Sequence, residues 1–496
     1  MPYSLLITLV FFLLSLIGIL NHEMWSDELM FWMIARDNAT LGDLIQTLRF
    51  EYMHPWLWGI LLFGLSRLTR EPLAMQLLHI LIATGAVFLL VQYSPFTRGQ
   101  KTLLVFGYFL LFEYSLISRN YGLGVLLIFL FCVLFPTRKR RYFPLAILLA
   151  VLTNINFYSR MTAIALIVLL VLEYLLAIWS GKPTLNRKWD IAGSLLIVAV
   201  GFMLSVVQNI PPPAQAGSLS VLSQGVKLNQ VVSAIANLWR AYFPMPGLTL
   251  RFWNSNMIDD GFAAALSWLP LGFSIALFYR RPLILFLYLF NLTEILLFHS
   301  LWTGLMRHLG HIFILFIACL WLSQEIPASD SDRLAPHPVL RFFDRYRRQF
   351  VTVVLVVQVI AGVYAYTMDL FHPFSEAKAV AQYLRRQQLD RSLIAGGIDV
   401  FTQSVSGHLD QPIFYPERDR MGTYISSDNS SQRLSPQQYL ERVVRQPGVE
   451  KAVFVLNFPL QEPLPSLPGW NLQELARFDR GIVKVENFYL YQFEKR

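Results

Sequence analysis

Long apolar runs separated by short charged clusters fill the first three quarters of the chain. About 20 consecutive apolar residues form a helix long enough to cross the hydrocarbon core of a bilayer. Most of the runs reach or approach that length, so the pattern predicts a mainly α-helical, polytopic membrane bundle of about eleven spans. The runs occupy residues 5–20, 55–68, 73–93, 102–135, 143–158, 162–179, 191–208, 262–279, 282–299, 308–323 and 350–370.

Lys and Arg in short loops predict the orientation of the chain, because such loops stay on the cytoplasmic side of the membrane. An odd number of crossings from a cytoplasmic N-terminus places the C-terminal residues outside. One run breaks this pattern. Residues 102–135 must cross only once, with an interfacial or re-entrant first half, and Arg98 and Lys101 then face outward against the charge rule. The basic clusters fall on alternate loops, at residues 138–141, 182–188, 280–281 and 341–348.

The last quarter of the chain has a different pattern, in which short buried strands alternate with amphipathic helices. This alternation predicts a small α/β domain with a largely parallel sheet. We therefore divide the chain into a transmembrane module, residues 1–372, and a soluble extracytoplasmic domain, residues 373–496. Helices are expected at 376–386 and 436–444, buried strands at 392–397 and 451–457, and a terminal strand or hairpin at 483–493.

The composition agrees with a multi-pass protein of the cell membrane and argues against nucleic-acid binding. Only 15% of the residues are charged, against about 25% in soluble domains. The formal net charge is +9, and the membrane module carries 26 Lys and Arg against 18 Asp and Glu, which is +8 of that charge. The excess lies in short loops beside lipid headgroups. Cys132 and Cys319 lie inside apolar runs, where packing is the usual role of a free cysteine.

The first outer loop, residues 21–54, places Asp27 and Glu28 shortly after the first span. A carboxylate at the membrane surface can take a proton from an acceptor hydroxyl and so act as general base on a lipid-borne substrate. The alternative is a solvated acidic loop that only obeys the orientation rule. His54 and Pro55 lie where the loop re-enters the membrane, and proline there is ordinary helix capping.

Three arginines lie in or beside apolar runs. Arg119, close to Tyr121, is costly in such surroundings unless it faces a polar cavity or an anion; a plain loop is the alternative. Arg160 lies at an outer hairpin, where a simple turn is the alternative.

Arg307 opens a later span together with two histidines. Arg307, His308 and His311 have spacings that share one helix face. They suit a phosphate or carboxylate clamp, with interfacial snorkelling as the alternative. We find no acid near Arg119 or Arg307 to pair with them, so we expect both to meet a ligand phosphate in the same outward-opening cavity as Asp27.

Together these features resemble the GT-C membrane glycosyltransferases, which include the protein mannosyltransferases and the bacterial aminoarabinose and RgtA-to-D-like transferases. The likeness consists of the first-loop acids, His54-Pro55 before an aromatic residue, Ser118-Arg119-x-Tyr121 and a C-terminal outer domain. By motif it covers about residues 1–172, and from there to residue 323 it rests on hydropathy. The sequence departs from the family in having Trp56 instead of a second proline and in lacking an acid after Tyr121 in the same apolar run.

The resemblance implies a catalytic carboxylate at Asp27 or Glu28 and a sugar donor carried on polyprenyl phosphate. Arg119 would neutralise the carrier phosphate. A hexosyl or pentosyl group would pass, with inversion, to a hydroxyl of a lipid, glycan or protein acceptor on the non-cytoplasmic face. A divalent metal is the one cofactor left open, and the missing second acid argues against it.

Two other classes of function stay open from the residues alone. A transporter or lipid flippase needs ionisable residues near the middle of the membrane, and Glu294 and Glu173 are acids within late spans. Glu294 is the residue that most favours this alternative. A non-catalytic membrane assembly protein, whose tail binds partners, is the third.

Overall fold

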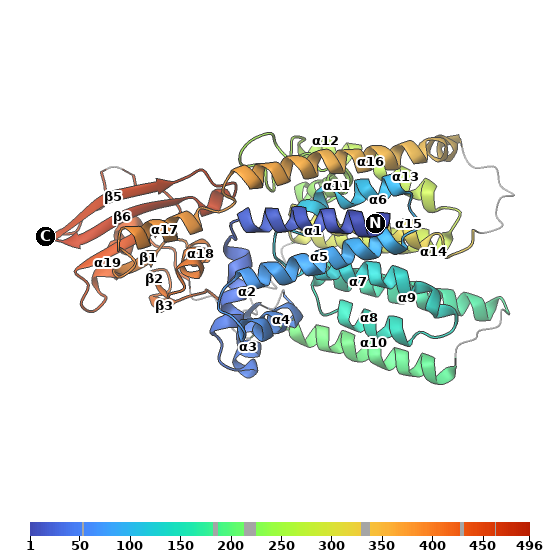
Figure 1. Ribbon diagram of the computed structural model, residues 1–496, viewed down its shortest axis with the longest axis horizontal. Helices are drawn as coiled ribbons and strands as arrows, with labels where there is room; N and C mark the ends of the chain where they lie inside the picture. The colour runs from blue at the N-terminus through green and yellow to red at the C-terminus, as the bar shows by residue number, and fades with distance from the viewer. Residues whose placement is uncertain (52–53, 182–186, 213–224, 329–337, 427–430, 462) are drawn as a thin grey trace.

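The protein consists of an elongated helical bundle with a small α/β domain at one end, as Figure 1 shows for the computed structural model. The structure describes residues 1–51, 54–181, 187–212, 225–328, 338–426, 431–461 and 463–496. The predicted fold class, a polytopic helical membrane bundle with a small C-terminal sheet domain, is confirmed.

Eight helices or helix pairs of the described residues are long and apolar enough to cross a membrane. Many of their side chains stay exposed although they are apolar, because lipid rather than water covers them. Three apolar helices are shorter: α4 (Leu57–Ser66), α8 (Phe143–Leu152) and α15 (Met306–Leu322). The long ones are α1 (Tyr3–Asn21), α5 (Leu73–Tyr93), α7 (Tyr121–Leu134) with the 3-10 turn η3 (Phe135–Lys139), α9 (Phe157–Trp179), α10 (Lys188–Gln208), α12 (Asp260–Leu266) with α13 (Trp268–Phe278), α14 (Pro282–Leu301) and α16 (Pro338–Phe371).

The passes between residues 55 and 135 differ from the prediction. Helix α4 has ten residues, about 15 Å of helix, which is half of a bilayer core. The run before α7 instead makes a pass of its own, through α6 (Arg98–Val105) and a π-helical turn, η2 (Phe109–Glu113). Tyr3 donates a hydrogen bond to the Arg98 carbonyl oxygen (2.7 Å) at the start of α1, whereas Arg119 lies beside the loop after α1. Residues 98–119 therefore run the length of α1.

This second pass removes the charge conflict, because Arg98 then lies at the same end of the bundle as the other basic clusters. We call it the basic end. Arg138 donates to the Glu325 carbonyl oxygen (3.1 Å) and Arg281 to that of Ile326 (3.0 Å), just beyond the end of α15. The prediction that Arg98 and Lys101 lie at the opposite end is wrong.

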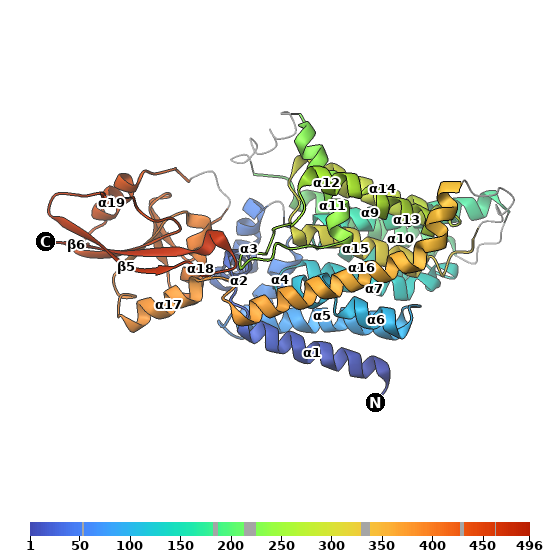
Figure 2. The same ribbon diagram turned by 90° about the horizontal axis from the view of Figure 1, so that it is seen from above.

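The opposite end carries α2 (Ser26–Asp37), α3 (Leu41–Leu48) and the C-terminal domain, and we call it the site end (Figures 1 and 2). A further helix, α11 (Leu228–Tyr242), packs on α12, α14 and α15. Glycine permits a close approach between backbones inside the bundle. A Cβ on Gly362 of α16 would lie 2.8 Å from the backbone nitrogen of Tyr108.

The C-terminal domain contains a six-stranded sheet in the order β3-β2-β1-β4-β6-β5. Only its centre is parallel, where β1 pairs with β2 and β4, and the three other pairs are antiparallel. The prediction of a largely parallel sheet is therefore wrong at both edges. The elements are α17 (Ala377–Arg386), β1 (Leu393–Gly396), α18 (Asp399–Leu409), β2 (Ile413–Tyr415), β3 (Arg420–Gly422), α19 (Pro436–Val444), β4 (Lys451–Leu456), β5 (Trp470–Phe478) and β6 (Phe488–Lys495).

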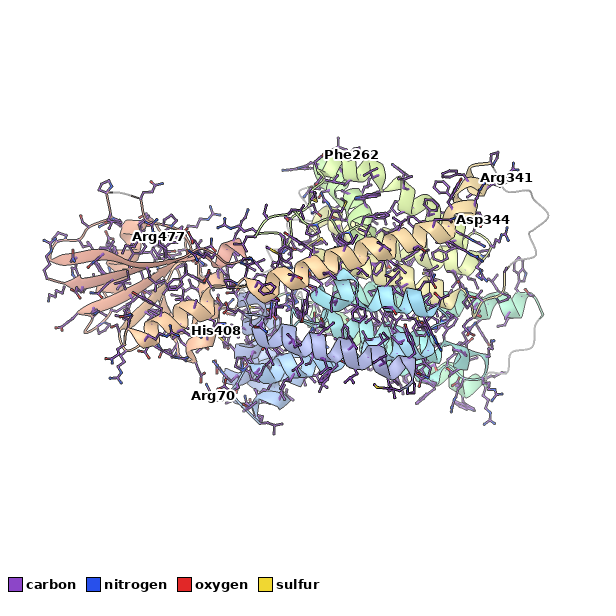
Figure 3. All side chains as sticks on the ribbon, turned by 45° about the horizontal axis from the view of Figure 1, so that its top comes forward. Arg70, Phe262, Arg341, Asp344, His408 and Arg477 are labelled. Atoms are coloured by element: carbon purple, nitrogen blue, oxygen red, sulfur yellow. The ribbon has the colours of Figure 1, made fainter. Side chains whose placement is uncertain are left out.

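The C-terminal domain docks on helix α2 through α18. His408 of α18 lies 3.2 Å from the Met24 carbonyl oxygen, and its position at the junction of the two parts is visible in Figure 3. At the other end of α2, Asp410 forms ion pairs with Arg36 (2.7 Å) and Arg70 (3.0 Å). The domain thus contacts both ends of one short helix, the helix that carries Asp27.

Candidate functional site

Asp27 lies in the first turn of α2, where the helix dipole favours a negative charge. Its carboxylate bridges two arginines from distant parts of the chain. Oδ1 lies 2.8 Å from Nη1 of Arg119, and Oδ2 lies 3.0 Å from Nη2 of Arg307. The Asp27 side chain is 21% exposed, against 2% for Arg119 and 11% for Arg307. The expectation that neither arginine has an acidic partner is wrong.

Glu28, the neighbouring carboxylate, faces away from this ion pair into the protein. It is fully buried, and its Oε1 accepts a hydrogen bond from the Ser118 backbone nitrogen (2.6 Å). Its Oε2 lies 3.1 Å from Nε2 of His22, whose Nδ1 lies 2.9 Å from Asp369 on α16. Glu28 therefore holds the residue before Arg119 in place and does not line the cavity described next.

A cavity of about 230 Å³ opens beside Asp27. It brings together Asp27, His54, Arg119 and Tyr121 with Arg307 and His308. These six sequence-predicted residues come from four separate stretches of the chain. The remaining wall is supplied by Asn156, Phe157, Tyr158, Phe298, Trp302 and Thr303.

Aromatic rings hold the Arg307 guanidinium from behind. It lies 5.5 Å from the ring of Trp25 and 5.8 Å from that of Trp253, distances at which a cation is attracted to the ring face. The Trp253 indole nitrogen donates to the buried Glu113 carboxylate (3.3 Å). These three supporting residues were missed in the sequence, because their spacing from Arg307 gives no local signal.

The two histidines of α15 have different positions, one in the wall of the cavity and one behind it. His308 lines the cavity, and its Nε2 lies 3.0 Å from the Tyr121 hydroxyl. His311 does not line it. It is buried against the rings of Tyr121 and Tyr158, at 5.8 and 5.2 Å.

Arg160 also lies outside the cavity wall. Its guanidinium lies over the Phe157 ring at 4.7 Å, and its Nε lies 3.5 Å from the Thr153 carbonyl oxygen. Arg160 therefore supports the aromatic wall from behind and does not point at Asp27.

The charges of the site follow from its burial and its ion pairs. Burial favours the neutral form of Asp27, but Arg119 and Arg307 outweigh it and hold the pKa of the carboxyl below its ordinary 3.8. Burial, with Arg119 nearby, lowers the pKa of His54 to about 3. At neutral pH Asp27 is therefore a carboxylate held between two guanidinium groups, and the imidazole of His54 is neutral.

Both arginines have hydrogen-bond donors that no described residue accepts from. Nε and Nη1 of Arg307 and Nε of Arg119 are buried without a hydrogen-bond partner among the described residues. Buried donors are nearly always paired in native proteins. Donors left open beside a cavity match an anionic ligand with several oxygen acceptors, such as a phosphate.

No protein-family model matches the sequence, and no curated protein matches it either. A solved structure does match: the crystal structure of ArnT from Cupriavidus metallidurans bound to undecaprenyl phosphate. The TM-score is 0.50 and the identity 9%, over 98% of this chain and 97% of that one. The chain shares the fold of that ArnT structure. The resemblance seen in the sequence is thereby confirmed at the level of the fold.

Among the described residues, no cluster of three His, Cys, Asp or Glu side chains could bind a metal. Both oxygens of Asp27 face guanidinium groups. The donor set beside Asp27 thus does not fit a divalent metal, and arginine supplies the positive charge there.

Two segments of the cavity wall had already been singled out in the sequence. Asn156 and Tyr158 precede Arg160 at an outer hairpin, and Trp302 and Thr303 lie in a loop expected outside. Their places in the wall became visible only in the fold, because α9 and the start of α15 meet there.

Proposed function

We propose that this protein is an integral-membrane glycosyltransferase that moves a sugar from a polyprenyl-phosphate carrier to an acceptor hydroxyl. The observation that carries the proposal is the cavity in which one carboxylate, Asp27, bridges two buried arginines. Both arginines have further hydrogen-bond donors without a partner among the described residues. The ArnT structure of the same fold was determined with undecaprenyl phosphate bound, which supports a lipid phosphate as the ligand of the arginines.

The donor phosphate would compete with Asp27 for Arg119 and Arg307. Phosphate accepts bidentate hydrogen bonds from arginine as a carboxylate does, and it offers more oxygens. When it binds, Asp27 gives up part of its ion pairing and becomes a stronger proton acceptor. The same two arginines stabilise the phosphate as it takes on charge in leaving.

The chemical step balances within this set of residues. The acceptor oxygen attacks the anomeric carbon as the bond from that carbon to the phosphate oxygen breaks. The anomeric carbon carries oxocarbenium-like charge on the way, the proton of the acceptor hydroxyl passes to Asp27, and polyprenyl phosphate leaves. In-line attack inverts the anomeric centre. The group transferred is hexosyl or pentosyl, and the acceptor is a lipid, a glycan or a protein.

The distribution of basic residues between the two ends of the bundle supports an extracytoplasmic site. All four regions that we place at the basic end, those of Arg98, Arg138, Arg281 and the start of α16, lie away from the cavity. By the positive-inside rule the basic end is cytoplasmic. The cavity and the C-terminal domain then face the other side.

The two acids that favoured a transporter, Glu173 and Glu294, do not line the cavity. Glu173 forms an ion pair with Arg138 (2.7 Å) at the basic end. Glu294 accepts a hydrogen bond from Asn291 of its own helix (3.2 Å) and does not line the cavity. Neither acid forms part of the site with Asp27.

A lipid profile of a strain that lacks this protein tests the proposal. The donor should accumulate as a polyprenyl-phosphate sugar, and the wild-type chain should remove it. A chain with Arg307→Gln should be made and inserted normally and should leave the donor accumulated. An unchanged polyprenyl-phosphate pool in the deletion strain would contradict the proposed donor.

A further inference from the structure

A second cleft lies at the basic end of the bundle, between α6, α13, α15 and α16. Its volume is about 250 Å³. The floor is apolar and includes Leu104, Ile317 and Leu320, whereas the rim is polar and includes Gln324, Arg347 and Arg348. None of these residues lines the cavity beside Asp27, which lies at the site end.

The rim of this cleft carries an excess of positive charge. Arg347 pairs with Asp344 through its Nη1 (2.9 Å), and Asp344 also lies 3.9 Å from Arg280. Arg348 is exposed and forms no ion pair with any residue that the structure describes. Asp344 lies at the end of α16 far from the C-terminal domain, as Figure 3 shows. The single carboxylate of Asp344 is thus shared between Arg347 and Arg280, and the charge of Arg348 is left unbalanced by any acid that the structure describes.

An apolar floor with a cationic rim matches the two parts of an anionic lipid at a membrane surface. Helix α16 enters its apolar stretch just after Arg348, so the rim lies at the level of the lipid headgroups and the floor at the level of the acyl chains. Basic pockets between transmembrane helices on the cytoplasmic side favour anionic lipid headgroups. Neutral lipids lack the net negative charge that the rim would select.

We propose that this cleft binds an anionic glycerophospholipid from the leaflet at the basic end. The lipid phosphate contacts Arg347 and Arg348, and an acyl chain occupies the floor along Leu104, Ile317 and Leu320. The site is separate from the donor cavity, and its occupancy is measured without sugar transfer.

The test is native mass spectrometry of the full chain released from nanodiscs of phosphatidylcholine that contain a small share of phosphatidylglycerol. The wild-type chain should retain phosphatidylglycerol in preference to phosphatidylcholine. An Arg347→Gln/Arg348→Gln chain should bind it more weakly, on the order of 30-fold, since each basic residue near an anionic surface contributes about a fivefold factor. Arg341→Gln/Arg345→Gln is the matched control, because it removes the same charge from exposed positions of the same helix outside the cleft.

A second variant tests the floor. Leu320→Trp fills the cleft and keeps both arginines, so it should also lose phosphatidylglycerol, whereas Leu297→Trp on the lipid-facing side of α14 should not. Equal losses of phosphatidylglycerol binding in the two double-arginine variants would show that general surface charge, and not the cleft, causes the effect, which would overturn the proposal. Normal lipid retention by Leu320→Trp would overturn the cleft as the site. Competition by inorganic phosphate at equal concentration would mean that the rim binds free phosphate instead of a lipid.

Discussion

At the scale of single residues, the two adjacent carboxylates of α2 are placed for different tasks. Successive helical residues point about 100° apart, so one of the pair can face the cavity while the next is buried. Asp27 faces the cavity and two arginines, whereas Glu28 is enclosed with His22 and the Ser118 amide. Both residues were candidates from the sequence, but no local signal separates them, because Arg119, Arg307 and the Ser118 amide lie about 90 to 280 positions away in the chain.

Substituting each carboxylate by its amide should separate these tasks. Asp27→Asn keeps the shape of the side chain and removes the proton acceptor, so transfer should fall roughly 100- to 10,000-fold with little change in thermal unfolding. Glu28→Gln should lower the free energy of unfolding by about 3 kcal/mol, because it leaves a buried charge without its partner. Both quantities are measured on purified protein. Near-normal transfer by Asp27→Asn would exclude it as the base.

His22 predicts a loss of stability at alkaline pH. Burial lowers the pKa of His22, but Asp369 and Glu28 raise it more, and the result is an increase from 6.5 to about 10. The protonated imidazole therefore stabilises the fold fully below pH 6.5, and this contribution is lost as the pH rises toward about 10.

Thermal unfolding from pH 6 to pH 10 measures this contribution. The melting temperature of the wild-type chain should fall across this window more steeply than that of His22→Gln, which has no titrating group there. Parallel curves would show that His22 is neutral in the folded protein.

At the scale of elements, hydropathy predicted the long helices well and the irregular stretch around the site poorly. An uninterrupted apolar run of this length, such as residues 73–93, can form only a single spanning helix, and these residues form α5. Residues 102–135 comprise the end of α6, a π-helical turn, a stretch of turns and bends, and α7. The polar segment at Ser118–Arg119 interrupts the pass because it must reach Glu28 and Asp27. Only tertiary partners reveal such a break. β5 was missed for the same reason, since its alternating burial depends on pairing with β6.

Helix α2 should depend on the C-terminal domain for its position. Glu486 of that domain accepts a hydrogen bond from the Ser26 backbone nitrogen (2.6 Å) at the first turn of α2 and another from Ser375. A charge-assisted hydrogen bond of this kind contributes about 1.5–3 kcal/mol. Glu486→Ala should therefore speed amide hydrogen exchange in α2 roughly 10- to 100-fold and lower the turnover number.

The matched control is Glu474→Ala, which removes a partly exposed carboxylate that pairs with Arg477 on β5 of the same domain. Exchange in α2 should then stay as in the wild type. If Glu486→Ala also leaves exchange in α2 unchanged, the domain does not position this helix.

At the scale of the whole molecule, the bundle has a basic end and a site end, and the account requires them to face opposite sides of the membrane. A phosphatase that is active only after export, fused after Arg496, should be active, and the same reporter fused in the loop after Arg138 should be inactive. The reverse result would place the cavity on the cytoplasmic side and exclude an extracytoplasmic donor.

The central claim is that Arg119 and Arg307 hold the phosphate of a polyprenyl carrier beside Asp27. The most direct measurement is binding of undecaprenyl phosphate to the purified chain in nanodiscs. Arg119→Gln and Arg307→Gln should each weaken binding roughly 10- to 100-fold, the loss of one charge-assisted hydrogen bond. Asp27→Asn should bind at least as tightly as the wild type, because the carboxylate no longer competes for the arginines, and should still fail to transfer sugar. Wild-type affinity in both arginine variants would contradict the account, because the carrier phosphate would then bind elsewhere.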